Sequence, residues 1–220
     1  MTTKNICIGT GLASLFFLGS MVKLGVMVGS HGLHFSCMTM IAPLMGAFFG
    51  VLPAFGILAV LFVVRSFVAT TGLTVGLPTL CATVSWHVSG ASKERTTRIA
   101  DVLLHVCLPV LSMIVFCAAT TGIACCYALY WLIPVAGYLA RMRGVDSLFV
   151  QALSSTFIAH AVGSIIWLFV VPMSPVQWVA LIPLVAVERF ISAVGMTAVY
   201  AGIKKLEVIV RRSGVIVTKI

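Results

Sequence analysis

The sequence predicts an all-α polytopic integral membrane protein, a helical bundle of six to eight transmembrane helices. Hydrophobic residues make up 61% of the 220 residues, charged residues make up only 9%, and the mean hydropathy is +1.18. Such a chain has too little polar surface to cover a water-soluble core. Its apolar residues form continuous runs, whereas a membrane β-barrel has alternating segments of about ten residues, so helices are favoured.

Length and charge limit the domain organisation. One crossing needs roughly 20 apolar residues. Residues 1–220 are therefore expected to form one transmembrane domain, of which residues 204–220 are a basic cytoplasmic tail. The formal net charge of +9 comes from basic residues in loops and tail, as the positive-inside rule predicts for a multi-pass protein of the cell inner membrane. The bilayer is the expected partner, and nucleic acid is not.

The seven cysteines lie mostly within apolar runs and show no C-x-x-C spacing. They are interpreted as small buried apolar side chains, so no disulfide, metal site or cofactor is expected.

The first apolar run, Ile6–Val28, is interpreted as an uncleaved helix, because it continues well beyond the length of a signal-peptide core. Gly9 and Ala13 are four residues apart, a small-xxx-small pair that lets another helix approach closely. Lys23, near the far end, can extend its charge to the interface.

Two stretches leave alternatives open. Phe35–Val64 is either one long kinked helix or a tight hairpin that breaks near Gly50–Pro53. Ser66–Val88 contains Gly72, Gly76 and Pro78, and is either a re-entrant or broken segment beside a binding site, or a loop that caps a short helix.

The later spans are clearer. Ile99–Ala140 is long enough for two spans with a turn at Thr120–Gly122, and Leu148–Val171 and Val176–Ile203 follow. At the start of the first of these, Asp101 and His105 are one helical turn apart and are expected to form a local pair.

The positions of Lys and Arg predict the topology. If the C-terminus is cytoplasmic, the basic loops Ser89–Arg98 and Arg141–Ser147 are cytoplasmic too, and the uncharged connections Thr120–Gly122 and Pro172–Gln177 face outward. The N-terminus is then also cytoplasmic. Six spans satisfy this pattern if Ser66–Val88 is a re-entrant segment. Eight spans satisfy it if Phe35–Val64 and Ser66–Val88 are each split and cross the membrane.

A polar stripe lies inside the apolar run at Ser154–Trp167. His160 would sit at membrane depth, where an ionisable group is costly and suggests a functional site. Glu188 and Arg189 lie near the middle of the next apolar run. Steps of four, four and three residues place the stripe on one helical face. The stripe comprises Thr156, His160, Ser164 and Trp167.

The same residues have a structural interpretation. A membrane histidine can hydrogen-bond to a neighbouring helix, and Glu188 and Arg189 could pair with Lys23 or Arg65 to hold helices together. The aromatic residues Tyr127, Tyr130, Trp131 and Tyr138 are interpreted as packing or interfacial residues, some of which could line a site.

The chain shows no H-E-x-x-H motif, no G-x-S-G motif and no second intramembrane aspartate, so it is not expected to be an enzyme. The favoured function is transport of a small organic metabolite, with a pocket between the last two or three helices. His160 and Glu188 would be its polar contacts, and Trp167 or Tyr130 an apolar wall. The alternatives are a non-transporting scaffold or assembly subunit and an enzyme that acts on a membrane-embedded substrate. A scaffold predicts a closed bundle with Glu188 paired to a basic side chain.

Three segments carry a resemblance to a known family. The chain contains FSCMTMIAPLMGAFFGVLPAFGILAVLFVVRSF and GLTVGLPT in its first half, and HAVGSIIW and VERF in its second half. This pattern resembles the substrate-binding S components of energy-coupling factor vitamin transporters, the biotin type especially.

The resemblance implies a small protein of about six membrane helices that captures a vitamin or its precursor for uptake. It also implies delivery by toppling against a transmembrane coupling subunit that two ATPase subunits drive. Gly9 and Ala13 would form the docking face for that subunit, Gly29–Phe35 the lid, and the His160 stripe with Glu188 the pocket.

Overall fold

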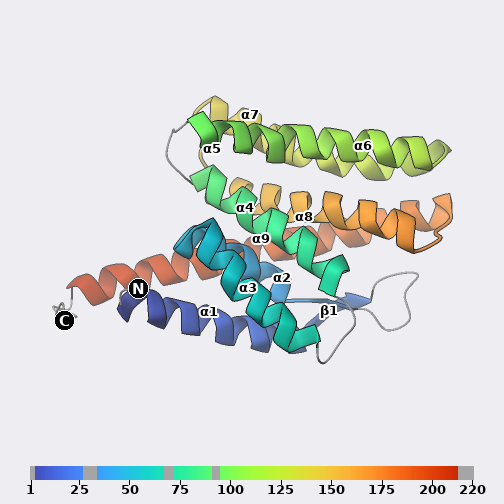
Figure 1. Ribbon diagram of the computed structural model, residues 1–220. Helices are drawn as coiled ribbons and strands as arrows, with labels where there is room; N and C mark the ends of the chain where they lie inside the picture. The colour runs from blue at the N-terminus through green and yellow to red at the C-terminus, as the bar shows by residue number, and fades with distance from the viewer. Residues whose placement is uncertain (1–2, 27–33, 67–71, 91–94, 213–220) are drawn as a thin grey trace.

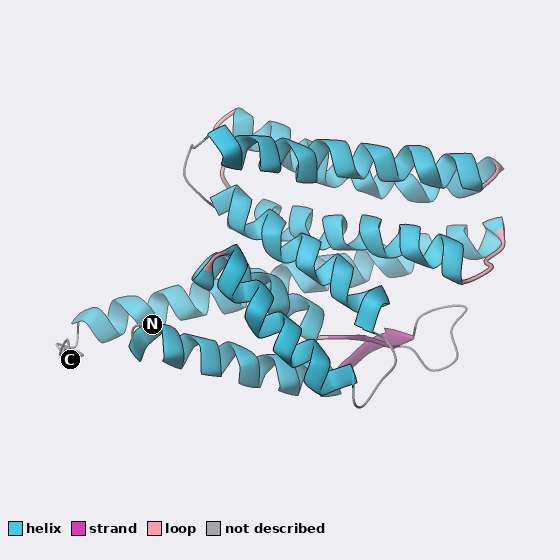
Figure 2. Ribbon diagram, in the orientation of Figure 1, coloured by secondary structure: helices cyan, strands magenta, loops and turns pink. Residues whose placement is uncertain are grey.

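The computed structural model describes residues 3–26, 34–66, 72–90 and 95–212. These residues form a helical bundle with one two-stranded hairpin (Figures 1 and 2). In this part of the chain, four helices are long and apolar enough to cross a membrane. They span Thr97–Ala119, Gly122–Met142, Leu148–Val170 and Pro175–Ile209. The helical class is confirmed, and six to eight crossings stay a prediction.

The first half of the chain contains α1 (Thr3–Met21), β1 (Lys23–Val26), β2 (His34–Ser36), α2 (Met38–Phe49), α3 (Val51–Ser66) and α4 (Gly72–Gly90). The second half contains α5 (Arg95–Val102), the π-helix η1 (Leu103–Cys107), α6 (Leu108–Ala119), the 3-10 helix η2 (Gly122–Trp131), α7 (Leu132–Met142), α8 (Leu148–Val170) and α9 (Pro175–Arg212).

The hairpin is a departure from the all-α prediction. Helix α1 ends at Met21, and β1 pairs antiparallel with β2, with Val26 opposite His34. Valines favour extended backbone and Gly25 weakens a helix, so the last part of the predicted first span leaves the helical conformation. Most of the proposed lid, Gly29–Phe35, lies outside the described residues.

The stretch Phe35–Val64 begins in β2 and continues as two helices, α2 and α3, that meet at Gly50. Of the two alternatives, the structure supports the break near Gly50–Pro53. Gly50 has φ +79°, a conformation that glycine adopts without steric cost. Pro53 lies in the first turn of α3, where its missing N–H has no helical partner to lose.

The broken segment predicted for Ser66–Val88 is wrong for its described part. Helix α4 is continuous from Gly72 to Gly90, with Pro78 inside it. Two side chains of α8 hydrogen-bond to carbonyls of α4: Ser155 donates to Ala82 over 2.9 Å, and Gln151 donates to Trp86 over 3.1 Å. Packing against a neighbouring helix therefore overrides the local breakers. Residues 67–71 lie outside the described part.

Two apolar clusters form the interior. The α2 cluster joins α1, α2, α3, α4, α8 and α9 and includes Leu12, Phe16, Leu44, Met45, Leu58, Ala152, Ala193 and Met196. The η2 cluster joins α6, η2, α8 and α9 and includes Phe116, Tyr127, Trp131, Phe157, Trp167, Trp178 and Val185. Helices α8 and α9 belong to both clusters and connect them.

The described ends of the chain lie at the same end of the bundle. In Figure 1, α1 begins and α9 finishes at the left, where α4 also ends and α5 begins, and the hairpin and the α6–η2 turn lie at the right. The even number of crossings stays a prediction. Helix α9 continues through Lys204 and Lys205 to Arg212, so the first part of the predicted tail is helical.

Close approach of α2 and α4 depends on Gly46. A Cβ at Gly46 would collide with the backbone carbonyl oxygen of Thr83, which has no side-chain freedom to move away. We expect Gly46→Ala to lower the free energy of unfolding by about 1–3 kcal/mol, the usual cost of overpacking. Thermal unfolding in detergent measures this effect.

Gly56→Ala is the matched control, because a Cβ at Gly56 meets no atom within 4 Å. Helix propensity predicts that this control is neutral or up to about 1 kcal/mol more stable. Equal melting temperatures for the two variants would contradict the close contact.

Candidate functional site

Helices α8 and α9 bring four buried polar side chains into the protein interior. We call His160 of α8 and Glu188, Arg189 and Ser192 of α9 the polar layer. Their side chains are 8%, 8%, 5% and 1% exposed. Along α9 the layer follows Trp178 and Val185 of the η2 cluster and precedes Ala193 and Met196 of the α2 cluster. Polar residues thus lie at the junction of the two apolar clusters.

The predicted stripe on α8 is buried along its whole length. Thr156, His160, Ser164 and Trp167 are at most 8% exposed, in agreement with one shared inward face. The hydroxyl of Thr156 donates to the carbonyl of Leu153 in its own helix over 2.9 Å. The hydroxyl hydrogen of Thr156 is therefore already used within α8.

His160 lies among aromatic rings. Its ring centroid is 5.4 Å from that of Tyr127 and 6.0 Å from that of Phe157. Its Nε2 atom has no hydrogen-bond partner among the described residues. A buried polar atom without a partner costs about 1–3 kcal/mol. This unused hydrogen-bonding capacity makes His160 a candidate ligand contact.

Aromatic side chains of α6, η2 and α9 pack together, and one of them, Tyr127 of η2, lies against His160. We call Phe116, Tyr127, Trp131 and Trp178 the aromatic wall. The ring centroids of Phe116 and Trp178 are 4.9 Å apart, and those of Tyr127 and Trp178 are 5.0 Å apart. The Tyr127 hydroxyl lies 3.2 Å from the Ser164 hydroxyl. The indole Nε1 of Trp131 has no hydrogen-bond partner among the described residues although Trp131 is fully buried.

Tyr130 connects η2 to both later helices. Its hydroxyl donates to the carbonyl of Ile182 over 2.8 Å, and its ring stacks on Phe157 at 5.4 Å. Its predicted position beside the last helices is therefore observed, although its hydroxyl is occupied.

Glu188 and Arg189 form an ion pair within one helix. Nη2 of Arg189 lies 3.1 Å from Oε1 of Glu188. Lys23, one proposed structural partner, is exposed, and the side chain of Arg65 lies outside the described residues. A pair between neighbours on one helix does not hold two helices together.

A second polar cluster lies at the end of the bundle where α4 and α7 end. Oδ1 of Asp101 lies 2.8 Å from Nδ1 of His105, which confirms the predicted local pair, and 2.7 Å from Nη2 of Arg141. Nη1 of Arg141 donates to Oγ of Ser89 over 2.8 Å, and Nε2 of His105 lies 3.2 Å from the same oxygen. Its groups satisfy one another, so this cluster fastens α4, η1 and α7 together.

The small pair on α1 is used within the chain. A Cβ at Gly9 would touch the ring of Phe49 on α2 at 3.4 Å, and Ala13 packs against the α2 cluster. The pair therefore lets α2 approach α1, and its role in docking a coupling subunit stays a prediction.

Sequence reasoning missed Trp178 and Ser192 as members of the site. Ser192 follows Glu188 by four residues, and this helical spacing is the signal that could have identified it. No comparable signal marks Trp178. Among the described residues, no group of three His, Cys, Asp or Glu side chains could hold a metal ion.

In comparisons with known proteins, the chain matches no protein family, no curated protein and no solved structure.

The cluster around Asp101 predicts a stability effect. Asp101→Asn removes the negative charge that faces both His105 and Arg141, and we expect a loss of about 2 kcal/mol, typical of hydrogen bonds to charged groups. Thermal unfolding in detergent tests this value. Asp146→Asn, in the exposed turn after α7, is the control and should melt as the wild type does. An Asp101→Asn variant as stable as this control would show that the cluster does not fasten the helices.

Proposed function

We propose that the chain is a membrane transport protein that binds a small organic metabolite for uptake, as the substrate-binding subunit of a multi-subunit transporter. The site lies between η2, α8 and α9, with His160 and Glu188 as polar contacts and the aromatic wall as its apolar side. The observation that carries this proposal is the Nε2 of His160, which has no hydrogen-bond partner within the described part of the chain and is buried near the middle of the 23-residue apolar helix α8. Intramembrane ionisable residues are costly and are usually functional.

The two polar clusters differ in a way that supports binding. Around Asp101, ion pairs and hydrogen bonds join three elements that are distant in sequence, as structural residues do. In the polar layer the ion pair stays within α9, and His160 and Ser192 have polar atoms without hydrogen-bond partners among the described residues. A cluster that only held helices together would be expected to use these atoms.

The composition of the site suits an organic molecule. Metabolite sites are mostly apolar with a few placed polar groups, and here aromatic rings surround one histidine and one ion pair. Helix η2 is a 3-10 helix of 10 residues. Runs of this length are uncommon because the hydrogen-bond geometry is poor. Tyr127 and Trp131 of the aromatic wall therefore lie on an element whose backbone hydrogen bonds are weaker than those of an α-helix.

The distribution of charge supports the proposed location. Basic residues gather at the end of the bundle where α9 finishes, including Arg98, Arg141, Arg143, Lys204 and Lys205. The positive-inside rule favours a cytoplasmic location for this end of the bundle and for both termini. The membrane proposed for the protein is the cell inner membrane. A coupling subunit and ATPase subunits are the proposed partners, and they rest on the family resemblance alone.

The scaffold alternative is favoured by two observations, the first of which is that Glu188 is paired to a basic side chain, that of Arg189. His160 and Glu188 are each only 8% exposed, so the bundle is closed around them. A scaffold needs no ligand, and a ligand-binding experiment therefore separates the two functions.

The test is thermal unfolding of the purified chain in detergent against a panel of vitamins, their precursors and related metabolites. A ligand at one hundred times its dissociation constant adds about 2.7 kcal/mol to the free energy of unfolding. We expect one compound to raise the melting temperature of the wild type, and His160→Ala and Glu188→Gln to lose this shift.

His87→Ala is the matched control. Nδ1 of His87 lies 3.1 Å from the carbonyl oxygen of Gly46, so its removal disturbs a histidine that joins α4 to α2 outside the site. This variant should melt lower but keep the ligand shift. If no compound shifts the wild type and all three variants merely melt lower, the scaffold function replaces transport.

A further inference from the structure

The polar layer holds one negative and one positive charge side by side. Oε1 of Glu188 and Nη2 of Arg189 are 3.1 Å apart, and both side chains are more than nine-tenths buried. The two charges cancel, so the site has no net charge when His160 is neutral. Separated from water, neither charge can lose its partner without a large cost.

We propose that the site binds a zwitterionic amino acid with a large apolar side chain, its ammonium group on Glu188 and its carboxylate on Arg189. This inference rests on the proposed function and names the substrate class of that site.

Charge balance is the first argument. A purely anionic ligand that bound Arg189 would leave Glu188 without its neutralising partner, and a purely cationic ligand would do the same to Arg189. Breaking a buried pair by removing one partner costs about 3–5 kcal/mol. A zwitterion supplies a counter-charge to each residue at once, so both remain neutralised.

Spacing is the second argument. The ammonium nitrogen and the carboxylate carbon of an α-amino acid are bonded to the same carbon, so the ligand presents its two charges close together. Glu188 and Arg189 are neighbours in the helix and present their charges equally close. Arg–carboxylate contacts are often bidentate, which favours Arg189 as the carboxylate partner.

The surrounding groups complete the assignment. His160 of the same polar layer has a buried Nε2 without a hydrogen-bond partner among the described residues, and in the proposed complex this nitrogen would donate to the carboxylate. Ser192 lies one turn after Glu188, and its buried hydroxyl has no hydrogen-bond partner among the described residues, so it can accept from the ammonium group. The aromatic wall would pack against the apolar side chain of the ligand, which is therefore expected to be aromatic or branched aliphatic.

The experiment compares four probes on the purified full chain in detergent by thermal unfolding over a ligand titration. L-Phenylalanine is zwitterionic and its methyl ester is cationic. N-acetyl-L-phenylalanine is anionic, and N-acetyl-L-phenylalanine methyl ester is uncharged. L-Tryptophan and L-leucine extend the series to other apolar side chains. We expect at least one free amino acid to bind and its singly charged and uncharged derivatives to bind at least tenfold more weakly.

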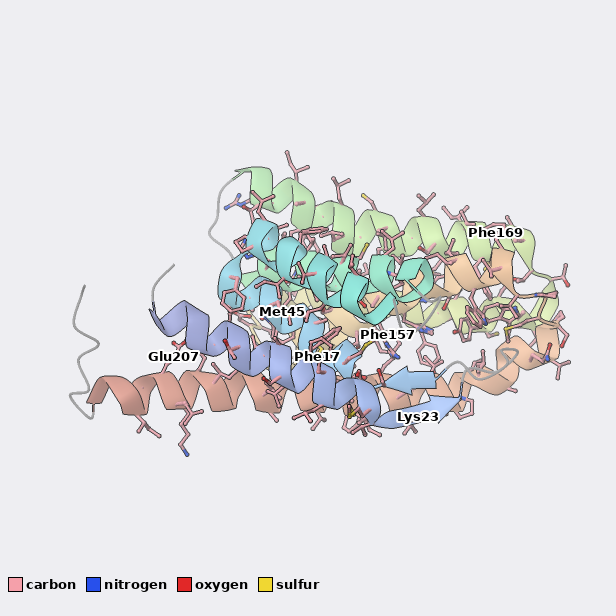
Figure 3. The ribbon with its side chains drawn as sticks, turned by 60° about the horizontal axis from the view of Figure 1, so that its bottom comes forward. Phe17, Lys23, Met45, Phe157, Phe169 and Glu207 are labelled. Carbon is pink, nitrogen blue, oxygen red and sulfur yellow. The ribbon has the colours of Figure 1, made fainter. Side chains whose placement is uncertain are left out.

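Two variants test the proposed orientation of the ligand. The measured quantity is the ratio of the affinities of two ligands for the same variant, which a general loss of stability does not change. Glu188→Gln should narrow the preference for the amino acid over its N-acetyl derivative by at least tenfold. Arg189→Gln should narrow the preference for the amino acid over its methyl ester by at least tenfold. Glu207→Gln, on the same helix but at the end remote from Phe157 (Figure 3), is the control and should leave both ratios unchanged.

The outcomes are distinguishable. Equal binding of a derivative and its parent amino acid, or affinity ratios that neither variant changes, overturns the zwitterion assignment and leaves metabolite binding intact. Binding of a vitamin from the first panel, with no response to any amino acid, has the same consequence. If no compound of either panel binds, both the assignment and the proposed function fail.

Discussion

The structure depends on the packing of α8, which contacts α4 on one side and α9 on another. Gln151 and Ser155 donate hydrogen bonds to carbonyls of α4, and Ala152 lies fully buried in the α2 cluster. Further along the helix, Phe157 and Trp167 belong to the η2 cluster. Because one helix takes part in both clusters, the position of His160 relative to α9 is fixed by contacts over the whole length of the bundle.

The polar side chains of the interior divide into two kinds. Around Asp101, each charge meets a partner on another element, and the cost of burial is offset by hydrogen bonds. The polar layer is buried more deeply, but His160 Nε2 and Ser192 Oγ have no hydrogen-bond partner among the described residues. Low-dielectric surroundings make such an arrangement expensive, and this cost is the physical reason to connect the polar layer with a ligand.

Local features were predictable and distant contacts were not. The turn at Thr120–Gly122, the break at Gly50 and the pair of Asp101 with His105 depend on residues close in sequence, and the structure confirms them. The continuous helix α4 was not predicted, because its breakers are overridden by α2 and α8. The hairpin of β1 and β2 was hidden within apolar residues that also suit a helix.

The sequence by itself determined a helical protein with membrane-length apolar segments and a polar stripe on one face of α8, because hydrophobicity and helical spacing are local properties. Only the tertiary structure decided that Tyr127 of η2 lies against His160 of α8, that Tyr130 hydrogen-bonds to Ile182, and that Gly9 faces Phe49 of its own chain. These contacts join segments far apart in the sequence. They depend on how whole helices pack, which no local pattern contains.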